Sequence, residues 1–486
     1  MAVIHRRRFL QSAAGAAGAL ALGGPFQGFA LAASSKPSFR QLRPIPDLRD
    51  GRVRLHLPEG FQYRSFHDTE AAVTLDDGTR LPGRHDGMGA FDAGNGNVLL
   101  VRNHEVNNPG PAFGDAAAAY DPMAQSGTTT IEVTPHGEVV HSYTSLNGTQ
   151  MNCSGGRMPW GAWITCEETV NGPDVGPDFT GVSNLPLTRK HGYIFEVPAG
   201  GQSTRQPITR AGRFAHEAVS FDPDEGILYL TEDNFGFPSG FYRYIPATNP
   251  METGELDDEG QLQMLAVKGQ PNANLAATQR KRATYDVEWV DIDDPDPTFP
   301  YTPGQTAPTT NDTALTYVGN QGRAKGAAYF SRLEGQAYDD RVVYFTATQG
   351  GGPAEASLGP IADGYGNGSG QVWAYKIDEG ILQLIFESPG ADVLDFPDNV
   401  TTSPRGTIIL CEDNTNDNYV RGLNRGGQLF SIALNRMVSS LNGAPRFGDE
   451  FAGSTFSPDG ETLFVNIQAS RGISYAIWGP WEKNGV

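Results

Sequence analysis

Residues 152–168, NCSGGRMPWGAWITCEE, have the pattern of a β-hairpin: a glycine-rich run, a Pro-Trp-Gly turn and an apolar run that ends in acids. The hairpin carries a thiol, Cys153, near its start and two carboxylates, Glu167 and Glu168, at its end. Soft sulfur and hard oxygen ligands favour different metal ions, so this unit predicts a site for more than one kind of metal. The alternative is a buried cysteine followed by an acidic surface turn.

The apolar half of this hairpin recurs along the chain. Six short β-rich runs end in a polar group, and each follows a turn-rich stretch and another short strand. The runs are VLLVRNHE (98–105), AWITCEE (162–168), LYLTEDN (228–234), VVYFTATQ (342–349), TIILCEDN (407–414) and TLFVNIQ (462–468). From Glu105 to Glu167 is 62 residues, and from Glu167 to Glu232 is 65. Six similar units at this spacing predict an all-β fold, a six-bladed β-propeller.

Two further segments bear on this ring. The wide interval between the third and fourth runs holds a Pro/Asp-rich segment, about 246–326, which predicts an irregular insertion on one blade. Strands near 52–66 and the C-terminal SYAIWGPW are expected to share a blade and close the ring. We therefore expect residues 33–486 to form a single propeller domain.

The start of each hairpin carries a candidate ligand. Cys153 lies fourteen residues before Glu167, and Asp398 lies fourteen before Glu412. The corresponding places in other units hold Asp86, Glu217 and Glu334. Because equivalent positions on successive blades point toward one axis, these side chains should meet at one mouth of the channel. Carboxylates packed together repel one another, so the pattern predicts bound cations.

The first 32 residues look like an export signal. Arg6, Arg7 and Arg8 precede Phe9 and Leu10, a weakly apolar Ala/Gly run follows, and Ala30-Leu31-Ala32 supplies a small-x-small cleavage site. This is typical of a twin-arginine signal, so we expect recognition by the twin-arginine export machinery and a periplasmic or secreted protein. The apolar run is shorter than the roughly 20 residues that a bilayer span needs, and no membrane span is expected.

Composition narrows the classes of partner. The formal net charge of −20 argues against nucleic acid as a partner and suits a protein that collects divalent cations. The three cysteines, Cys153, Cys166 and Cys411, cannot build a disulfide framework, and Cys166 and Cys411 are expected to pack inside their blades. A propeller has no open sheet edge that needs a partner, so a monomer is expected.

Several segments together resemble the PhoX-type alkaline phosphatases. The matching pieces, in chain order, are NCSGG–PWG–W–TCEE, GRFAHEAV (212–219), YLTEDN–GFYRYIP (229–246), FSRLEG (330–335) and FAGSTFSPDGETLFVNIQ (451–468). The resemblance implies a six-bladed propeller with a centre of ferric iron, Fe(3+), and calcium, Ca(2+), that hydrolyses phosphate esters.

The resemblance also implies roles for particular residues. Cys153, Glu217, Arg332 and Glu334 match positions of the family's motifs, and Cys153 marks the place where iron is expected. The other expected ligands follow from the blade alignment, with Glu168 as the alternative to Glu167. They are Glu105, Glu167, Glu232, Asp398 and Glu412.

The expected chemistry is attack of a metal-bound oxide or hydroxide on a phosphate monoester, since no serine nucleophile motif and no HExxH spacing occur. Arg332 would grip the phosphoryl oxygens, and its alternative role is a salt bridge to Glu334. His104 and His216 each precede a candidate glutamate, and each is expected to hold that carboxylate.

Two other functions fit parts of the pattern. A calcium-dependent propeller lactonase or esterase would need neither a cysteine ligand nor an arginine that grips phosphate. A non-catalytic propeller would use calcium only for structure. Cys153 and Arg332 favour the phosphatase.

Overall fold

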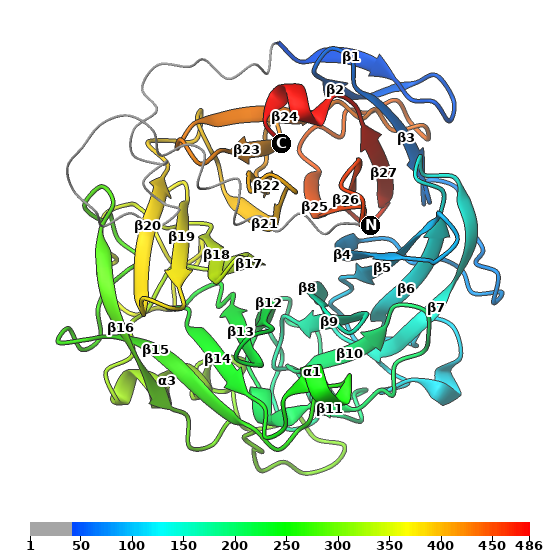
Figure 1. Ribbon diagram of the computed structural model, residues 1–486. Coiled ribbons are helices and arrows are strands. Elements are labelled where there is room, and N and C mark those ends of the chain that lie inside the picture. The colour runs from blue at the N-terminus through cyan, green and yellow to red at the C-terminus, as the bar shows by residue number, and fades with distance from the viewer. Residues whose placement is uncertain (1–40) are drawn as a thin grey trace, which may run out of the picture.

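The computed structural model describes residues 41–486 and is built almost entirely from antiparallel β-strands. The strands surround a central axis, with β4, β8, β12, β17, β21 and β25 innermost (Figure 1). The α-helices of this part of the chain are short: α1 (Pro250–Thr253), α2 (Asn311–Leu315) and α3 (Tyr317–Ala324). No helix within residues 41–486 is long and apolar enough to span a membrane. The predicted all-β, propeller-like arrangement is confirmed.

Three of the five sheets have four strands each. The first contains β4 (His85–Asp92), β5 (Val98–His104), β6 (Ser126–Val133) and β7 (Val139–Thr149). The second contains β8 (Asn152–Met158), β9 (Ala162–Glu167), β10 (Ile194–Pro198) and β11 (Pro207–Ile208). The third contains β25 (Glu450–Phe456), β26 (Thr462–Gln468), β27 (Ile473–Trp478) and β3 (Gln62–Phe66).

The other two sheets are larger. One contains β21 (Pro397–Thr402), β22 (Ile408–Glu412), β23 (Tyr419–Leu423), β24 (Leu429–Asn435), β2 (Val53–Leu57) and β1 (Arg43–Pro46). The nine-stranded sheet joins two antiparallel runs through β16 (Thr284–Asp291). These runs are β12 (His216–Asp222), β13 (Ile227–Glu232), β14 (Phe241–Ile245) and β15 (Gln261–Val267), then β17 (Leu333–Asp339), β18 (Val342–Ala347), β19 (Gln371–Lys376) and β20 (Ile381–Glu387).

The ends of the described chain meet in one sheet. β3 pairs with β27 from Phe66 opposite Ser474 to Gln62 opposite Trp478. This confirms the expected closure for residues 62–66, whereas β2 instead pairs with β24 of the neighbouring sheet. The predicted signal, 1–32, lies outside the described residues, so the predicted division into a signal and one domain stays a prediction.

The Pro/Asp-rich segment 246–326 is more regular than its composition predicts. It contains β15, which pairs with β14, and β16, which pairs with both β15 and β20. Thus one part of the expected insertion completes a sheet, and another part bridges two antiparallel runs. Proline-rich composition hid these strands, because their apolar residues lie between long polar connections.

Buried side chains from neighbouring sheets pack against one another. Met88 and Leu100 of the first sheet, for example, share a core with Phe464 and Ala476 of the third. Strands covered on both faces lose the usual polar alternation, which explains near-continuous apolar runs such as ILYL at 227–230. Burial of this apolar surface is the main stabilising contribution to the ring.

Every inner strand contains the same irregularity. In β8, Asn152 pairs with Glu167 but the next pair is Gly155 with Thr165, so one extra residue bulges out of the ladder. β4, β12, β17, β21 and β25 shift register in the same way. The inner strands almost touch at this bulge: a Cβ atom on Gly87 would lie 2.6 Å from the Cα of Ser154. The bulges therefore set the geometry of the channel mouth.

Candidate metal centre

The bulges turn one polar side chain from each of five inner strands toward the same mouth. These bulge residues are Asp86, Cys153, Glu217, Glu334 and Asp398. On β25 the equivalent residue is Gly453, whose backbone packs against the carbonyl of Asp86. A β-bulge redirects its side chain, which explains why residues far apart in sequence converge here.

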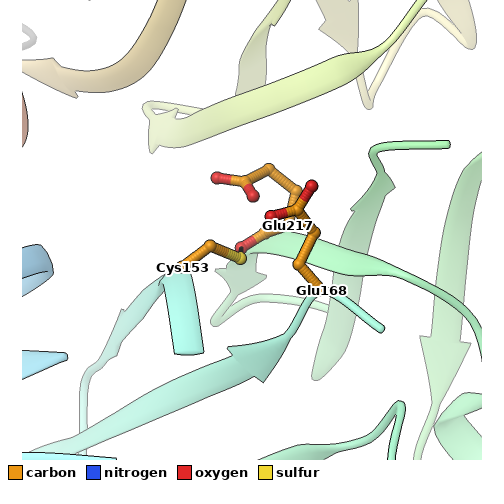
Figure 2. Close-up of side chains that lie close together, drawn as sticks. All are labelled: Cys153, Glu168 and Glu217. Carbon is orange, nitrogen blue, oxygen red and sulfur yellow. Dashed lines mark hydrogen bonds between the residues drawn. The ribbon is translucent and has the colours of Figure 1, made fainter. Parts of the chain in front are cut away.

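Three overlapping groups within residues 41–486 have ligand atoms within 4.8 Å of one another. The first is Cys153, Glu168 and Glu217, whose side chains point toward one another in Figure 2. The second is Glu217, Glu334 and Asp398, and the third is Asp398, Asp413 and Glu450. We call these groups, together with Asp86, Glu105 and Asp233, the acidic mouth.

The acids that follow the second strands supply part of this mouth. Glu105, Glu168, Asp233 and Asp413 each come one residue after the last residue paired with an inner strand. Glu105 lies beside Arg84, whose Nη1 is 3.0 Å from Glu105 Oε2, and it also accepts a hydrogen bond from Gln468. The structure therefore brings Glu105 to the acidic mouth but not into one of the three close groups.

Glu167 does not join the acidic mouth, and its neighbour Glu168 does. Glu167 Oε1 accepts hydrogen bonds from the Gln150 amide at 2.8 Å and lies 2.6 Å from His191 Nδ1, while Oε2 accepts from the Gly192 amide at 2.8 Å. These bonds are within its own sheet and its loops. The geometry therefore favours Glu168 as a metal ligand, in place of the expected Glu167. Adjacent residues of an extended chain point in opposite directions, so only one of the two can face the mouth.

Glu232 and Glu412, like Glu167, bond within their own sheets rather than at the acidic mouth. Glu232 Oε2 accepts hydrogen bonds from the Gly240 amide and from the hydroxyl of Tyr242. Glu412 accepts from the Tyr419 amide and from Arg421 Nε at 2.9 Å. Neither glutamate joins a close group of the acidic mouth, whereas the following residue Asp413 does, and Asp233 lies against Arg332.

The charges of the acidic mouth oppose one another. Burial, together with Asp398 and Asp86, raises the pKa of Glu217 well above its ordinary value. Burial and Asp413 raise the pKa of Asp398 to about 7. Burial, with Glu217 and Glu168 nearby, likewise raises the pKa of the Cys153 thiol. Bound cations would reverse these shifts, because they neutralise the carboxylates and deprotonate a ligating thiol.

Arg332 is a cation inside this mouth. Its Nη2 lies 2.6 Å from Asp233 Oδ2 and 3.0 Å from Glu334 Oε1, and its Nε also donates to Asp233. Burial opposes its charge, but these two carboxylates raise the pKa of Arg332 well above its ordinary value. Nη1 makes no hydrogen bond to any residue that the structure describes. The salt bridge to Glu334, which was the alternative to phosphate binding, is thus present, and one edge of the guanidinium remains for an anion.

The two histidines lie behind the mouth and do not contact the glutamates that follow them. His104 Nδ1 lies 2.9 Å from the Gly83 carbonyl, and His216 Nε2 lies 2.9 Å from the Gly212 carbonyl. Burial lowers the pKa of His216 to about 3 and that of His104 well below its ordinary value, so both are neutral. They hold the loops that enter β4 and β12, which differs from the expected carboxylate contact.

Sequence reasoning missed Asp233, Asp413 and Glu450. For Asp233 and Asp413 a signal existed: each follows a glutamate at the end of a strand, as Glu168 does, and the second acid is the one that reaches the axis. Glu450 carried no such signal, because it begins β25 and its proximity to Asp413 is a tertiary contact.

The fold and the site together define an all-β, propeller-like protein with a thiol, carboxylates and an arginine at one mouth. The family model described as Alkaline phosphatase PhoX matches residues 40–142 and 135–470, which is most of the chain. The chain belongs to the PhoX alkaline phosphatase family, as its motifs predicted, and is an enzyme of the alkaline phosphatase type.

One solved structure supports the propeller-like fold of this chain, and a second is a weaker match. Pseudomonas fluorescens PhoX in complex with vanadate, a transition state analogue, is 16% identical with a TM-score of 0.62, and the alignment covers 92% of this chain and 98% of that chain. The gluconolactonase XC5397 from Xanthomonas campestris is 14% identical with a TM-score of 0.40, covering 91% and 99% of the two chains. No curated protein sequence matches the chain.

Proposed function

We propose that this protein is an exported, metal-dependent phosphatase that hydrolyses phosphate monoesters at the acidic mouth. The observation that carries this proposal is the gathering of Cys153, the carboxylates and Arg332 at one end of the inner strands. A phosphoryl group needs cationic partners, and an acidic cluster can supply them only by binding metal ions.

The donor atoms fit two kinds of ion. Cys153, Glu168 and Glu217 combine a sulfur with carboxylates, a set suited to ferric iron. Asp398, Asp413 and Glu450 offer oxygen alone, as calcium prefers. The raised pKa values of Glu217 and Asp398 support cation binding, because burial and neighbouring carboxylates oppose the negative charge of both acids. Ions bound there would lower the pKa of water and neutralise phosphoryl oxygens.

Arg332 would orient the ester. Asp233 and Glu334 fix the guanidinium on one side, which leaves the Nη1 edge for a phosphoryl oxygen. A planar guanidinium binds phosphate through parallel hydrogen bonds and loses little freedom when its position is already fixed. Cys153, expected from the sequence to be a catalytic residue as well as a ligand, would contribute through the metal ion that its sulfur holds.

The proposal also covers the number of propeller blades and the cellular location of the protein. If the two runs of the nine-stranded sheet count as separate blades, the ring has the six blades that the repeats predict. We propose export by the twin-arginine pathway to the periplasm or the medium, with small phosphate esters as substrates and a monomeric protein.

Metal analysis of the protein purified from expression of the full chain, combined with assays on a phosphate monoester, a diester and a lactone, tests this function. We expect iron and calcium, and release of phosphate from the monoester. Calcium without iron, together with hydrolysis of the lactone and no release of phosphate, would overturn the proposal.

A further inference from the structure

Phe235 is an exposed aromatic residue beside the acidic mouth. It lies in the connection after β13, two residues after Asp233, and 46% of its surface is exposed. The neighbouring mouth is built from carboxylates, Cys153 and Arg332. An exposed large apolar side chain at a charged mouth is a candidate contact for the apolar part of a ligand.

The ring contacts the residue proposed to bind phosphate. The Cζ atom of Arg332 lies 4.9 Å from the centre of the Phe235 ring, within the range of a cation–π interaction. Asp233 holds the guanidinium from another direction through Nε and Nη2. Phe235 and Asp233 come from the same connection, so one short segment positions Arg332 with a carboxylate and an aromatic ring.

This segment is itself held in place. The Phe235 carbonyl accepts a hydrogen bond from the Tyr365 amide at 2.7 Å, and the Gly236 carbonyl accepts one from the Ile361 amide at 2.9 Å. The connection after β18 that supplies these amides also carries Leu358, which is 54% exposed. The ring of Phe235 is therefore presented on a supported backbone rather than on a free loop.

We propose that Phe235 is a specificity-determining residue of the phosphatase: its exposed part contacts the leaving group of the ester and favours aromatic or other apolar leaving groups. The inference rests on the proposed function, because only a phosphoryl group bound at Arg332 would bring the leaving group to Phe235. The alternative is that Phe235 only positions Arg332, in which case all esters would depend on the ring equally.

The test compares two monoesters, 1-naphthyl phosphate and glycerol phosphate, in the metal-loaded enzyme. The ratio compared is kcat/KM for naphthyl phosphate divided by kcat/KM for glycerol phosphate. In Phe235→Ala we expect this ratio to fall about tenfold, mostly because KM for naphthyl phosphate rises. A tenfold change is the size expected for the loss of one buried apolar contact. Phe235→Leu should keep most of the ratio, because it keeps apolar surface. Val140→Ala, an exposed apolar residue on the outer strand β7, is the control.

The outcomes separate the two proposals. A wild-type protein that releases no phosphate from either ester overturns the proposed function and this inference with it. An active wild type whose ratio is unchanged in Phe235→Ala overturns this inference alone, whether or not both activities fall together.

Discussion

The two ends of the inner strands differ in chemistry although the same strands build both. At one end lies the acidic mouth. At the other, the later residues of the same strands line a cavity of about 540 Å³ whose polar lining includes Ser154, Ser220, Gln336, Asn399 and Thr401. We call this the hydroxyl cavity. The bulge separates the two ends, since Cys153 and Asp398 face the acidic mouth while the next residues, Ser154 and Asn399, line the hydroxyl cavity.

The difference predicts that the acidic mouth, and not the hydroxyl cavity, depends on bound cations. In the hydroxyl cavity two neutral side chains bond to each other: Ser220 donates to Gln336 Oε1 at 2.8 Å, and Gln336 Nε2 donates to the Ala218 carbonyl at 2.6 Å. In the acidic mouth the carboxylates compete, and burial with neighbouring acids raises the pKa of Glu334 and Glu450 as well. Changes at the mouth should therefore alter metal content and activity, whereas changes in the cavity should not.

The largest effect is expected at Cys153. Cys153→Ala removes the sulfur of the first ligand group and should abolish iron binding and lower kcat/KM for a phosphate monoester at least about 100-fold. Elemental analysis and a steady-state assay measure this. Cys166→Ala is the matched control, since Cys166 is buried and packs in the same apolar core as Cys153 but belongs to none of the close groups. Equal metal contents in the two variants would contradict the assignment.

Glu168 and Glu167 allow a sharper comparison between two neighbouring residues. Glu168→Gln should lower metal content and cut activity about 10–100-fold, while the metal-free protein keeps its stability because one repelling charge is gone. Glu167→Gln should keep the metals but destabilise the fold by about 2–3 kcal/mol, since it disturbs bonds to His191 and three backbone amides. The opposite pattern, measured by denaturation and metal analysis, would restore Glu167 as the ligand.

The bulge that divides the two ends can be tested at Gly87. A Cβ atom there would lie 2.7 Å from the Cys153 carbonyl oxygen, so Gly87→Ala should push β4 from β8 and destabilise the protein by about 1–3 kcal/mol. Gly200→Ala is the control, because its nearest contact would be Leu99 at 3.9 Å. Urea denaturation that gives both variants the stability of the wild type would show that the inner strands have room to separate.

A buried histidine behind the acidic mouth predicts a dependence of stability on pH. Burial opposes protonation, but Glu167 and Asp121 raise the pKa of His191 to about 9. Since the folded protein holds this proton more tightly than the unfolded chain, the stabilisation is complete below about pH 6.5 and is lost between about pH 6.5 and 9. We expect the free energy of unfolding to fall by about 1–2 kcal/mol as the pH rises through this range, followed by Tm. His191→Gln should remove this part of the pH dependence. If the same pH dependence of Tm persists in His191→Gln, another titrating group causes it.

The smallest effect is expected in the hydroxyl cavity. Ser220→Ala removes a neutral hydrogen bond to Gln336 and should cost about 0.5–1.5 kcal/mol with unchanged metal content and kcat. Loss of iron or calcium in this variant would mean that the two ends of the strands are coupled.

Much of the fold was predictable because it rests on local pattern. The recurring apolar runs predicted antiparallel strands in repeated units, and SYAIWGPW with strands near 52–66 predicted the closing sheet, in which residues 62–66 take part. The strands β15 and β16 were not predicted, since the pairing of Thr284–Asp286 with β20 joins residues about 100 positions apart. At the site, the structure brings Cys153, Glu217, Glu334 and Asp398 together, and beside them lie Glu168 and Asp413 rather than the expected Glu167 and Glu412, one residue earlier. Alternation along a strand has a period of two, so an alignment error of one residue moves each side chain to the opposite face.

The amino-acid sequence alone established the family, the repeated strands and the presence of a thiol among acids, because these depend on residue identity and local spacing. Which acid of each pair faces the axis, and which acids stand within 4.8 Å of one another, followed from the bulges and from contacts between sheets. A bulge depends on the register between two paired strands and on how closely the neighbouring inner strands approach. The residue spacing within a single run determines neither of these.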